Sequence, residues 1–335
     1  MNNLKFMPDL LTGRLNEYDA KRYFSRFGWF AFTYFLLSSI VSVIIAIIAI
    51  NLFPAVYQHY LFSETLNVVV SYGIALPISY VIIKPLPTVK PDPEKMKVSH
   101  WFYGLCISVA LMIIGNYITS IVLVFFISPL RGVSMQSPVS ERIDSVPLWV
   151  TILFIVIIAP ILEEIFFRGI LCKKLTIIGE GYAIILPSAF FALCHGNFFQ
   201  LFYAFTLGCF FSFIYIKTGK LIYTIIYHMA INLIGSVISP LIIDQLDITS
   251  LLENGFSINS ENILRVIGFL WYELIIVGVA IFGVVIAIKK RKEFKVHEGL
   301  LPPPEHKGVS CVLLNSGVAA SIAIFAYTLL GSLLL

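Results

Sequence analysis

The sequence predicts an all-α, polytopic membrane protein with seven clear transmembrane helices and one broken or re-entrant segment, about eight in all. The first observation is composition: 59% of the 335 residues are hydrophobic and only 13% are charged, about half the roughly 25% charged share of soluble domains. The second is that the apolar residues form long continuous runs rather than an alternating pattern, which favours helices over a transmembrane barrel. Because lipid offers no hydrogen bonds, the backbone of such runs must pair within itself.

Seven apolar runs are long enough to cross a bilayer, which takes about 20 residues. They comprise residues 28–53, 66–83, 101–127, 147–165, 221–240, 263–288 and 309–335. A further apolar segment, residues 183–216, is interrupted by Pro187 and by His195-Gly196-Asn197. Residues 184–194 would form 11 residues of helix, about 16 Å or half of the bilayer. We therefore predict a hairpin that either spans or re-enters, with His195 at its tip.

The charged loops predict the orientation in the membrane. Loops rich in lysine and arginine are cytoplasmic by the positive-inside rule. The basic loop positions are Lys5, Arg14, Lys21, Arg22, Arg26, Lys90, Lys95, Lys97, Lys173, Lys174, Lys217, Lys220 and the run from Lys289 to Lys292. We expect a multi-pass protein of the cell membrane, in a bacterial plasma membrane, with a cytoplasmic N-terminus. The net charge is only +4 and is spread over short loops, so no nucleic-acid partner is expected.

Ionisable side chains within apolar runs are candidates for function, because inserting one costs roughly 2.5–3.5 kcal/mol. Glu163, Glu164 and Arg168 lie together in the fourth run. Glu164 and Arg168 are four residues apart and share a helix face, which predicts an ion pair. Glu163 points about 100° away from Glu164 and is left without a local partner. We therefore expect Glu163 to have a raised pKa and to act as a general base.

Two other segments carry polar groups at matching depths. His195 ends an apolar helix, and His228 and Asn232 share one face of a later helix. Counting from the cytoplasmic lysines places Glu163, His228 and Asn232 about 12–18 Å into the membrane, so we expect one cavity open to the cytoplasm. A carboxylate that takes a proton from water, with neutral donors for an oxyanion, suits amide hydrolysis. The alternative is a metal site, with Glu163, His195 and His228 as zinc ligands.

Three spaced motifs occur in order: Glu163-Glu164-x-x-x-Arg168, Phe191-x-x-x-His195 and His228-x-x-x-Asn232. Together they resemble the CAAX-protease and bacteriocin-processing (Abi) family of intramembrane endopeptidases, over about residues 147–240. The resemblance implies that Glu163 activates water with the help of His195, and that His228 and Asn232 form the oxyanion hole. Glu164 and Arg168 would orient the helix. No cofactor is required in this interpretation, and zinc is possible because some members of the family are described as metalloproteases.

The resemblance also predicts how the chain is organised. Residues 1–146 would be N-terminal membrane helices, residues 147–240 the protease core and residues 241–335 C-terminal membrane helices. The expected partners are membrane lipids and a substrate that is a peptide or a lipidated, for example prenylated, protein precursor; the oligomeric state is left open. Two other functions fit the same residues: a non-cleaving immunity or peptide-binding protein, and a transporter with a proton relay. The sequence has no internal repeat, which argues against the transporter.

Overall fold

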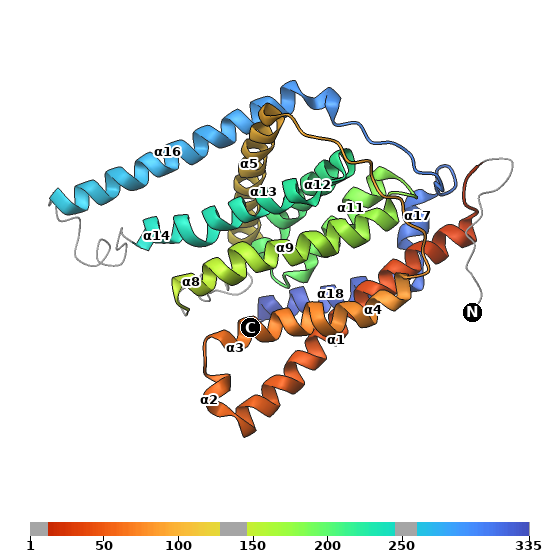
Figure 1. The fold of residues 1–335 in the computed structure, drawn as a ribbon, viewed down its shortest axis with the longest axis horizontal. Helices are drawn as coiled ribbons and strands as arrows, with labels where there is room; N and C mark the ends of the chain where they lie inside the picture. Colours follow the sequence, from red (N-terminus) through yellow and green to blue (C-terminus); the bar gives the residue numbers. More distant parts are fainter. Residues whose placement is uncertain (1–12, 128–145, 245–259, 335) are drawn as a thin grey trace. The chain divides into compact units, whose positions relative to one another are not determined.

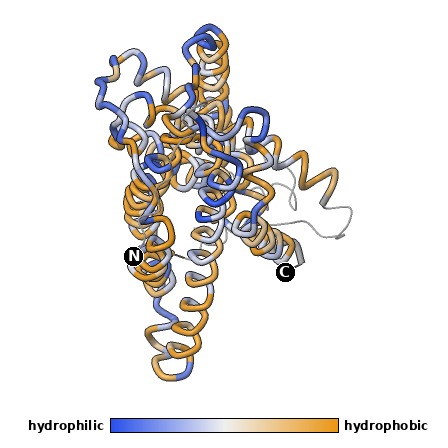
Figure 2. Tube along the Cα trace, turned by 90° about the vertical axis from the view of Figure 1, so that its right-hand side faces the viewer, coloured by the Kyte–Doolittle hydropathy of each residue, from blue (hydrophilic) through white to orange (hydrophobic). Residues whose placement is uncertain are grey.

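The computed structural model describes residues 13–127, 146–244 and 260–334, and within them the protein is helical, with no β-strand (Figure 1). Seven helical stretches of this described part are long and apolar enough to cross a membrane. They are Glu17–Leu52, Leu61–Ile83, Val98–Phe126, Leu148–Leu175, Phe198–Thr218, Leu221–Asp244 and Ile263–Lys289. Apolar residues run along these helices, whereas polar residues gather in the connecting segments (Figure 2). The chain is thus an all-α polytopic membrane protein, as predicted.

The broken apolar segment forms two helices, α11 (Glu180–Cys194) and α12 (Phe198–Thr218), which pack against each other. The break falls at residues 195–197, as predicted. The second arm, α12, is long enough to span by itself, whereas α11 is one of two shorter apolar helices. The two arms approach closely at Gly208, where an added Cβ would lie 2.9 Å from Cβ of Ser188.

The last apolar run differs from the expected continuous helix. It is divided into α17 (Gly308–Leu313) and α18 (Ser316–Leu334). Asn315 lies at the division, and its side chain bonds to backbone groups on both sides of it. Nδ2 donates to the carbonyl of Val312 at 2.7 Å, and Oδ1 accepts from the amide of Val318 at 2.9 Å. An asparagine that bonds nearby backbone groups in this way competes with helix continuation.

The described residues form two compact units. The first unit comprises Met1–Glu94, Leu162–Leu221 and Val296–Leu335, as far as these are described. Besides α11, α12, α17 and α18, its elements are α1 (Glu17–Leu52), α2 (Pro54–Tyr57), α3 (Leu61–Val68), the π-helical η1 (Val69–Ala75), α4 (Leu76–Ile83), the π-helical η4 (Ile165–Cys172) and α10 (Lys173–Leu175). The short helix α9 (Ala159–Glu164) leads into η4.

The second unit comprises Lys95–Ile161 and Ile222–Lys295, as far as described. Its elements are α5 (Val98–Val122), η2 (Leu123–Ile127), α8 (Leu148–Val150), the π-helical η3 (Thr151–Ile158), α13 (Leu221–Leu233), η5 (Ile234–Ile238), α14 (Ser239–Asp244), α16 (Ser260–Lys289) and the 3₁₀ turn η6 (Arg291–Glu293). Helices α5 and α16 pack together, with Gly283 directly against the backbone of Cys106. The Tyr227 hydroxyl of α13 donates to the Trp101 carbonyl of α5 at 2.9 Å.

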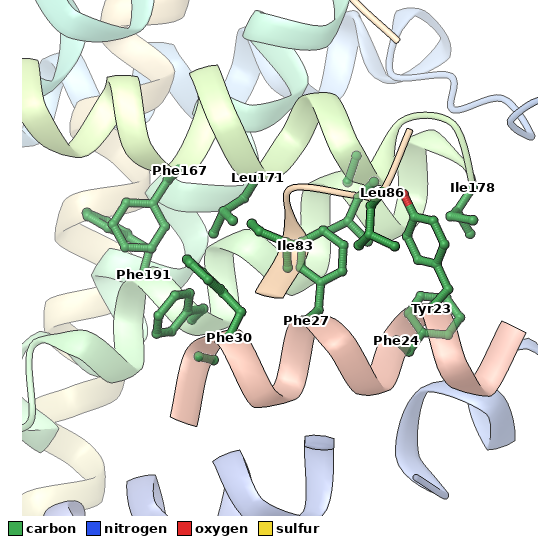
Figure 3. Close-up of a cluster of buried hydrophobic side chains, with 14 of the residues drawn as sticks. Tyr23, Phe24, Phe27, Phe30, Ile83, Leu86, Phe167, Leu171, Ile178 and Phe191 are labelled. Atoms are coloured by element: carbon green, nitrogen blue, oxygen red, sulfur yellow. The ribbon is translucent and has the colours of Figure 1, made fainter. Parts of the chain in front are cut away.

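The core of the first unit is aromatic, and it holds α1 against the segment that carries the two glutamates. Phe30 of α1 packs edge-on against Phe166 of η4 at 5.8 Å and Phe190 of α11 at 5.9 Å between ring centroids. Edge-to-face pairs of this kind contribute about 0.5–1.5 kcal/mol each beyond burial. The side chains that α1 directs into this core meet residues of α4, η4 and the turn before α11 (Figure 3).

The proline-rich stretch Pro302-Pro303-Pro304 is packed within the first unit. The carbonyl of Pro302 accepts from the amide of Leu15, and the amide of Leu301 donates to the carbonyl of Ile177, both at 2.8 Å. A few residues earlier, the carbonyl of His297 accepts from the amide of Glu180 at 3.0 Å. This stretch therefore fixes the starts of α1 and α11, and through α11 the position of His195.

Candidate active site

The predicted ion pair between Glu164 and Arg168 is present. Nη1 of Arg168 lies 2.8 Å from Oε1 of Glu164, and both side chains are 0% exposed. Glu164 is the last residue of α9, and Arg168 follows one turn later in η4. Because removing two charges from water is costly, such a pair is tolerated only when each charge has its partner. Glu164 is therefore the ion-pair partner of Arg168.

Arg168 also reaches both arms of the α11–α12 hairpin. Its Nη2 donates to the carbonyl of Gly208 in α12 at 3.1 Å. Its guanidinium lies over two aromatic rings, 5.0 Å from the centroid of Phe191 in α11 and 5.6 Å from that of Phe211 in α12. A planar cation suits this position because it can donate hydrogen bonds in its plane and also interact with aromatic rings. Arg168 thus fastens the glutamate-bearing helix to the hairpin.

His195 has a fixed ring orientation at the end of α11. Its Nδ1 lies 2.9 Å from the carbonyl oxygen of Phe191, and the Phe191 ring meets it edge-on with 4.9 Å between centroids. A carbonyl oxygen can only accept, so Nδ1 carries the proton of this bond, and Nε2 would present a lone pair when the ring is neutral. Phe191 is the first residue of the second motif. In the structure it contacts both Arg168 and His195.

The turn after His195 explains why the helix breaks there. Gly196 has φ +67°, a left-handed conformation that glycine adopts without strain. Asn197 then caps α12, with Oδ1 accepting from the amide of Gln200 at 3.0 Å. A Gly-Asn pair is suited to these two adjacent roles. The turn leaves His195 at the junction of the two arms.

Glu163 is half-buried, and it does not lack partners, contrary to the expectation from sequence. Its carboxylate interacts electrostatically with the thiol of Cys194 and with the phenols of Tyr34, Tyr72 and Tyr203. These groups come from α1, η1, α11 and α12, so four elements contribute to the surroundings of Glu163. Sequence reasoning missed the three tyrosines. Their signal was a polar hydroxyl within an otherwise apolar run.

His228 and Asn232 lie one turn apart on α13, in the second unit. His228 is only 5% exposed. Nδ2 of Asn232 donates to the carbonyl of Ile155 in the π-helical η3 at 2.8 Å. An amide nitrogen carries two N–H groups, so Asn232 has a second one to offer a substrate oxygen. Glu163, Glu164, Arg168 and His195 belong to the first unit, and the joint cavity with His228 and Asn232 stays a prediction.

The zinc alternative also stays a hypothesis. Among the described residues, no group of three or more His, Cys, Asp and Glu side chains is arranged to hold a metal ion. Glu163 and His195 share one unit, and the third suggested ligand, His228, belongs to the other. We therefore assign no chemical step to a metal.

In a comparison with known families, residues 145–234 match the model described as type II CAAX prenyl endopeptidase Rce1-like. Comparisons with curated proteins and with solved structures give no match. The matched segment contains all three motifs and so supports a CAAX-type intramembrane protease. Residues 145–234 of this chain are thus similar to the Rce1-like model, which is consistent with the CAAX-protease and bacteriocin-processing family.

Proposed function

We propose that the protein is an intramembrane endopeptidase that hydrolyses a peptide bond in a prenylated or otherwise membrane-associated precursor, using water activated by Glu163. The observation that carries the proposal is the unequal environment of the two adjacent glutamates. Glu164 is fully buried and ion-paired with Arg168, whereas Glu163 is half-buried and interacts electrostatically with three phenols. Only Glu163 is therefore suited to contact a substrate or a water molecule.

The proposed reaction needs a base, an oriented imidazole and an oxyanion site. Glu163 takes a proton from water, and the resulting hydroxide attacks the peptide carbonyl carbon. His195 assists through Nε2, the ring nitrogen that is not used in the bond to the Phe191 carbonyl. When the C–N bond breaks, the proton passes from Glu163 to the leaving amine. By family resemblance, His228 and Asn232 supply the neutral donors that stabilise the oxyanion.

The substrate class is proposed from the family description, which specifies a prenyl endopeptidase. A prenylated tail partitions into the bilayer, so a protease whose active site lies between membrane helices can receive it laterally. The cytoplasmic N-terminus, the plasma-membrane location and the division into residues 1–146, 147–240 and 241–335 are further parts of the proposal. Membrane lipids are its expected surroundings.

The test uses the purified full chain in lipid vesicles and a fluorogenic peptide that ends in a farnesylated CAAX sequence. The unprenylated peptide serves as the substrate control. We expect the wild type to cleave the farnesylated peptide, and Glu163→Gln to lose at least about 100-fold in kcat/KM, the usual range for a lost general base. The kcat/KM of His195→Ala and of His228→Ala should also fall strongly. Glu305→Gln, at an exposed position, is the matched control and should retain full activity.

Three results would change the conclusion. Cleavage by Glu163→Gln at the wild-type rate would refute the glutamate mechanism. Activity that a chelator abolishes and zinc restores would replace it with the zinc-dependent variant. Binding of the farnesylated peptide by a wild type that cleaves neither peptide would favour the peptide-binding alternative.

A further inference from the structure

A continuous line of side-chain hydrogen bonds runs from the backbone of His195 to the hydroxyl of Tyr203. Nδ2 of Asn197 donates to the carbonyl of His195 at 2.8 Å and lies 2.9 Å from Oε1 of Gln200. Nε2 of Gln200 lies 2.8 Å from the Tyr203 hydroxyl. All of these residues are at least half-buried, so solvent does not replace the bonds freely.

The direction of every bond in this line follows from two backbone groups. The amide N–H of Gln200 can only donate, so the Asn197 side chain faces it with Oδ1. Nδ2 of Asn197 then faces the His195 carbonyl, which can only accept. Oε1 of Gln200 must accept from Nδ2 of Asn197, which leaves Nε2 of Gln200 as the donor to Tyr203. The Tyr203 oxygen is therefore an acceptor in this bond, and its own proton points elsewhere.

The Glu163 carboxylate interacts electrostatically with the phenol of Tyr203. Capping of α12 requires only Asn197, so the extension through Gln200 to Tyr203 is not needed to begin the helix. A side-chain amide that forces a phenol to accept on one side makes it a donor toward the other side.

We propose that Gln200 and Tyr203 are positioning residues of the active site, in which the bond from Gln200 leaves the proton of the Tyr203 hydroxyl available to the Glu163 carboxylate. This inference rests on the proposed function. The line of bonds then couples the His195 turn to the base, so that the two groups keep one relative orientation. Tyr203 acts through Glu163 and contacts no scissile bond.

The experiment measures kcat and KM of the full chain in vesicles with the farnesylated peptide, for Tyr203→Phe, Gln200→Glu and the double variant. Tyr203→Phe removes only the hydroxyl, and we expect about a tenfold loss of kcat with KM within twofold, the effect of one hydrogen bond that favours the transition state. Gln200→Glu has no N–H to give, so the Tyr203 proton turns toward the new carboxylate and kcat falls similarly. The double variant should lose no more than either single one.

Tyr23→Phe is the matched control. It deletes the same atom from a buried tyrosine of the same unit, whose hydroxyl donates to the carbonyl of Lys174 at 2.6 Å. It should lower the unfolding temperature and leave kcat unchanged. Wild-type kcat in Tyr203→Phe, or additive losses in the double variant, would overturn the inference while Glu163→Gln stays inactive. A wild type that cleaves no peptide would overturn the proposed function and this inference together.

Discussion

The most demanding test of the buried charge arrangement is to replace Arg168 by methionine, alone and together with Glu164→Gln. Methionine keeps most of the side-chain volume and removes the charge. Arg168→Met leaves the Glu164 carboxylate at 0% exposure without its cation. Removing one partner of a buried ion pair costs about 3–5 kcal/mol, because the remaining charge is desolvated and uncompensated.

The double variant separates the charge effect from the loss of contacts. With both charges gone, the desolvation penalty disappears, and exchanging a buried pair for neutral groups is often close to neutral. The remaining loss comes from the stacking on Phe191 and Phe211, about 1–2 kcal/mol in total. The Gly208 carbonyl keeps its bond within α12, so it is not left unsatisfied. We therefore expect the double variant to recover at least about 1 kcal/mol of the loss caused by Arg168→Met.

The assay is equilibrium unfolding of the full chain in detergent micelles, followed by the fluorescence of its four tryptophans across a denaturant series. Arg168→Lys is the matched control, since it keeps the charge and loses the planar fork; its stability should fall between those of the wild type and Arg168→Met. A double variant that is as unstable as Arg168→Met would refute the reasoning, because it would mean that contacts rather than charge balance decide the cost.

Three smaller predictions follow from single positions. Gly196→Ala should cost about 1–2 kcal/mol of stability, measured by denaturant unfolding, and lower kcat, since φ +67° is unfavourable with a Cβ and the turn sets His195. Gly208→Ala should destabilise by about 1–3 kcal/mol, measured the same way, because its Cβ would lie 2.9 Å from Cβ of Ser188. The hydrogen bond from Lys290 lowers the pKa of Glu293. The stabilisation from this exposed pair, below about 0.5 kcal/mol, should be present at neutral pH and disappear as pH falls through the lowered pKa. Glu293→Gln should abolish this pH dependence in a pH series of unfolding curves.

Local rules were sufficient for features formed within one stretch of chain. The pairing of Glu164 with Arg168 follows from helical spacing, and the hairpin break follows from a glycine and an asparagine after His195. The division of the last run at Asn315 was missed because an isolated asparagine in an apolar run has several possible roles. In that case the role of the asparagine is decided by the backbone groups to which its side chain bonds. Those groups depend on which rotamer the surrounding helices allow.

Long-range features could not be derived in the same way. Tyr34, Tyr72 and Tyr203 are far apart in the sequence, and nothing in their spacing predicts that all three border Glu163. The packed proline stretch, whose Pro302 carbonyl accepts from the amide of Leu15, likewise depends on a contact between opposite ends of the chain. Periodicity predicts the face that a residue occupies and not the residues that meet that face.

The structure gives a physical reason why the first two motifs occur together. Each contains a residue that is proposed to react and a residue that connects: Glu163 with Arg168, and His195 with Phe191. The connecting residues touch each other, with the Arg168 guanidinium 5.0 Å from the Phe191 ring, and Phe191 in turn binds His195 through its carbonyl. Changing Phe191 to leucine would therefore remove a cation–π contact and an edge-on ring contact at once, although the backbone carbonyl would remain. Its effect should appear in kcat as well as in stability. Phe211→Leu loses the stacking on Arg168 and leaves the ring contact between Phe191 and His195 in place, so it should affect stability alone. Equal effects of the two substitutions on kcat would show that Phe191 does not orient His195.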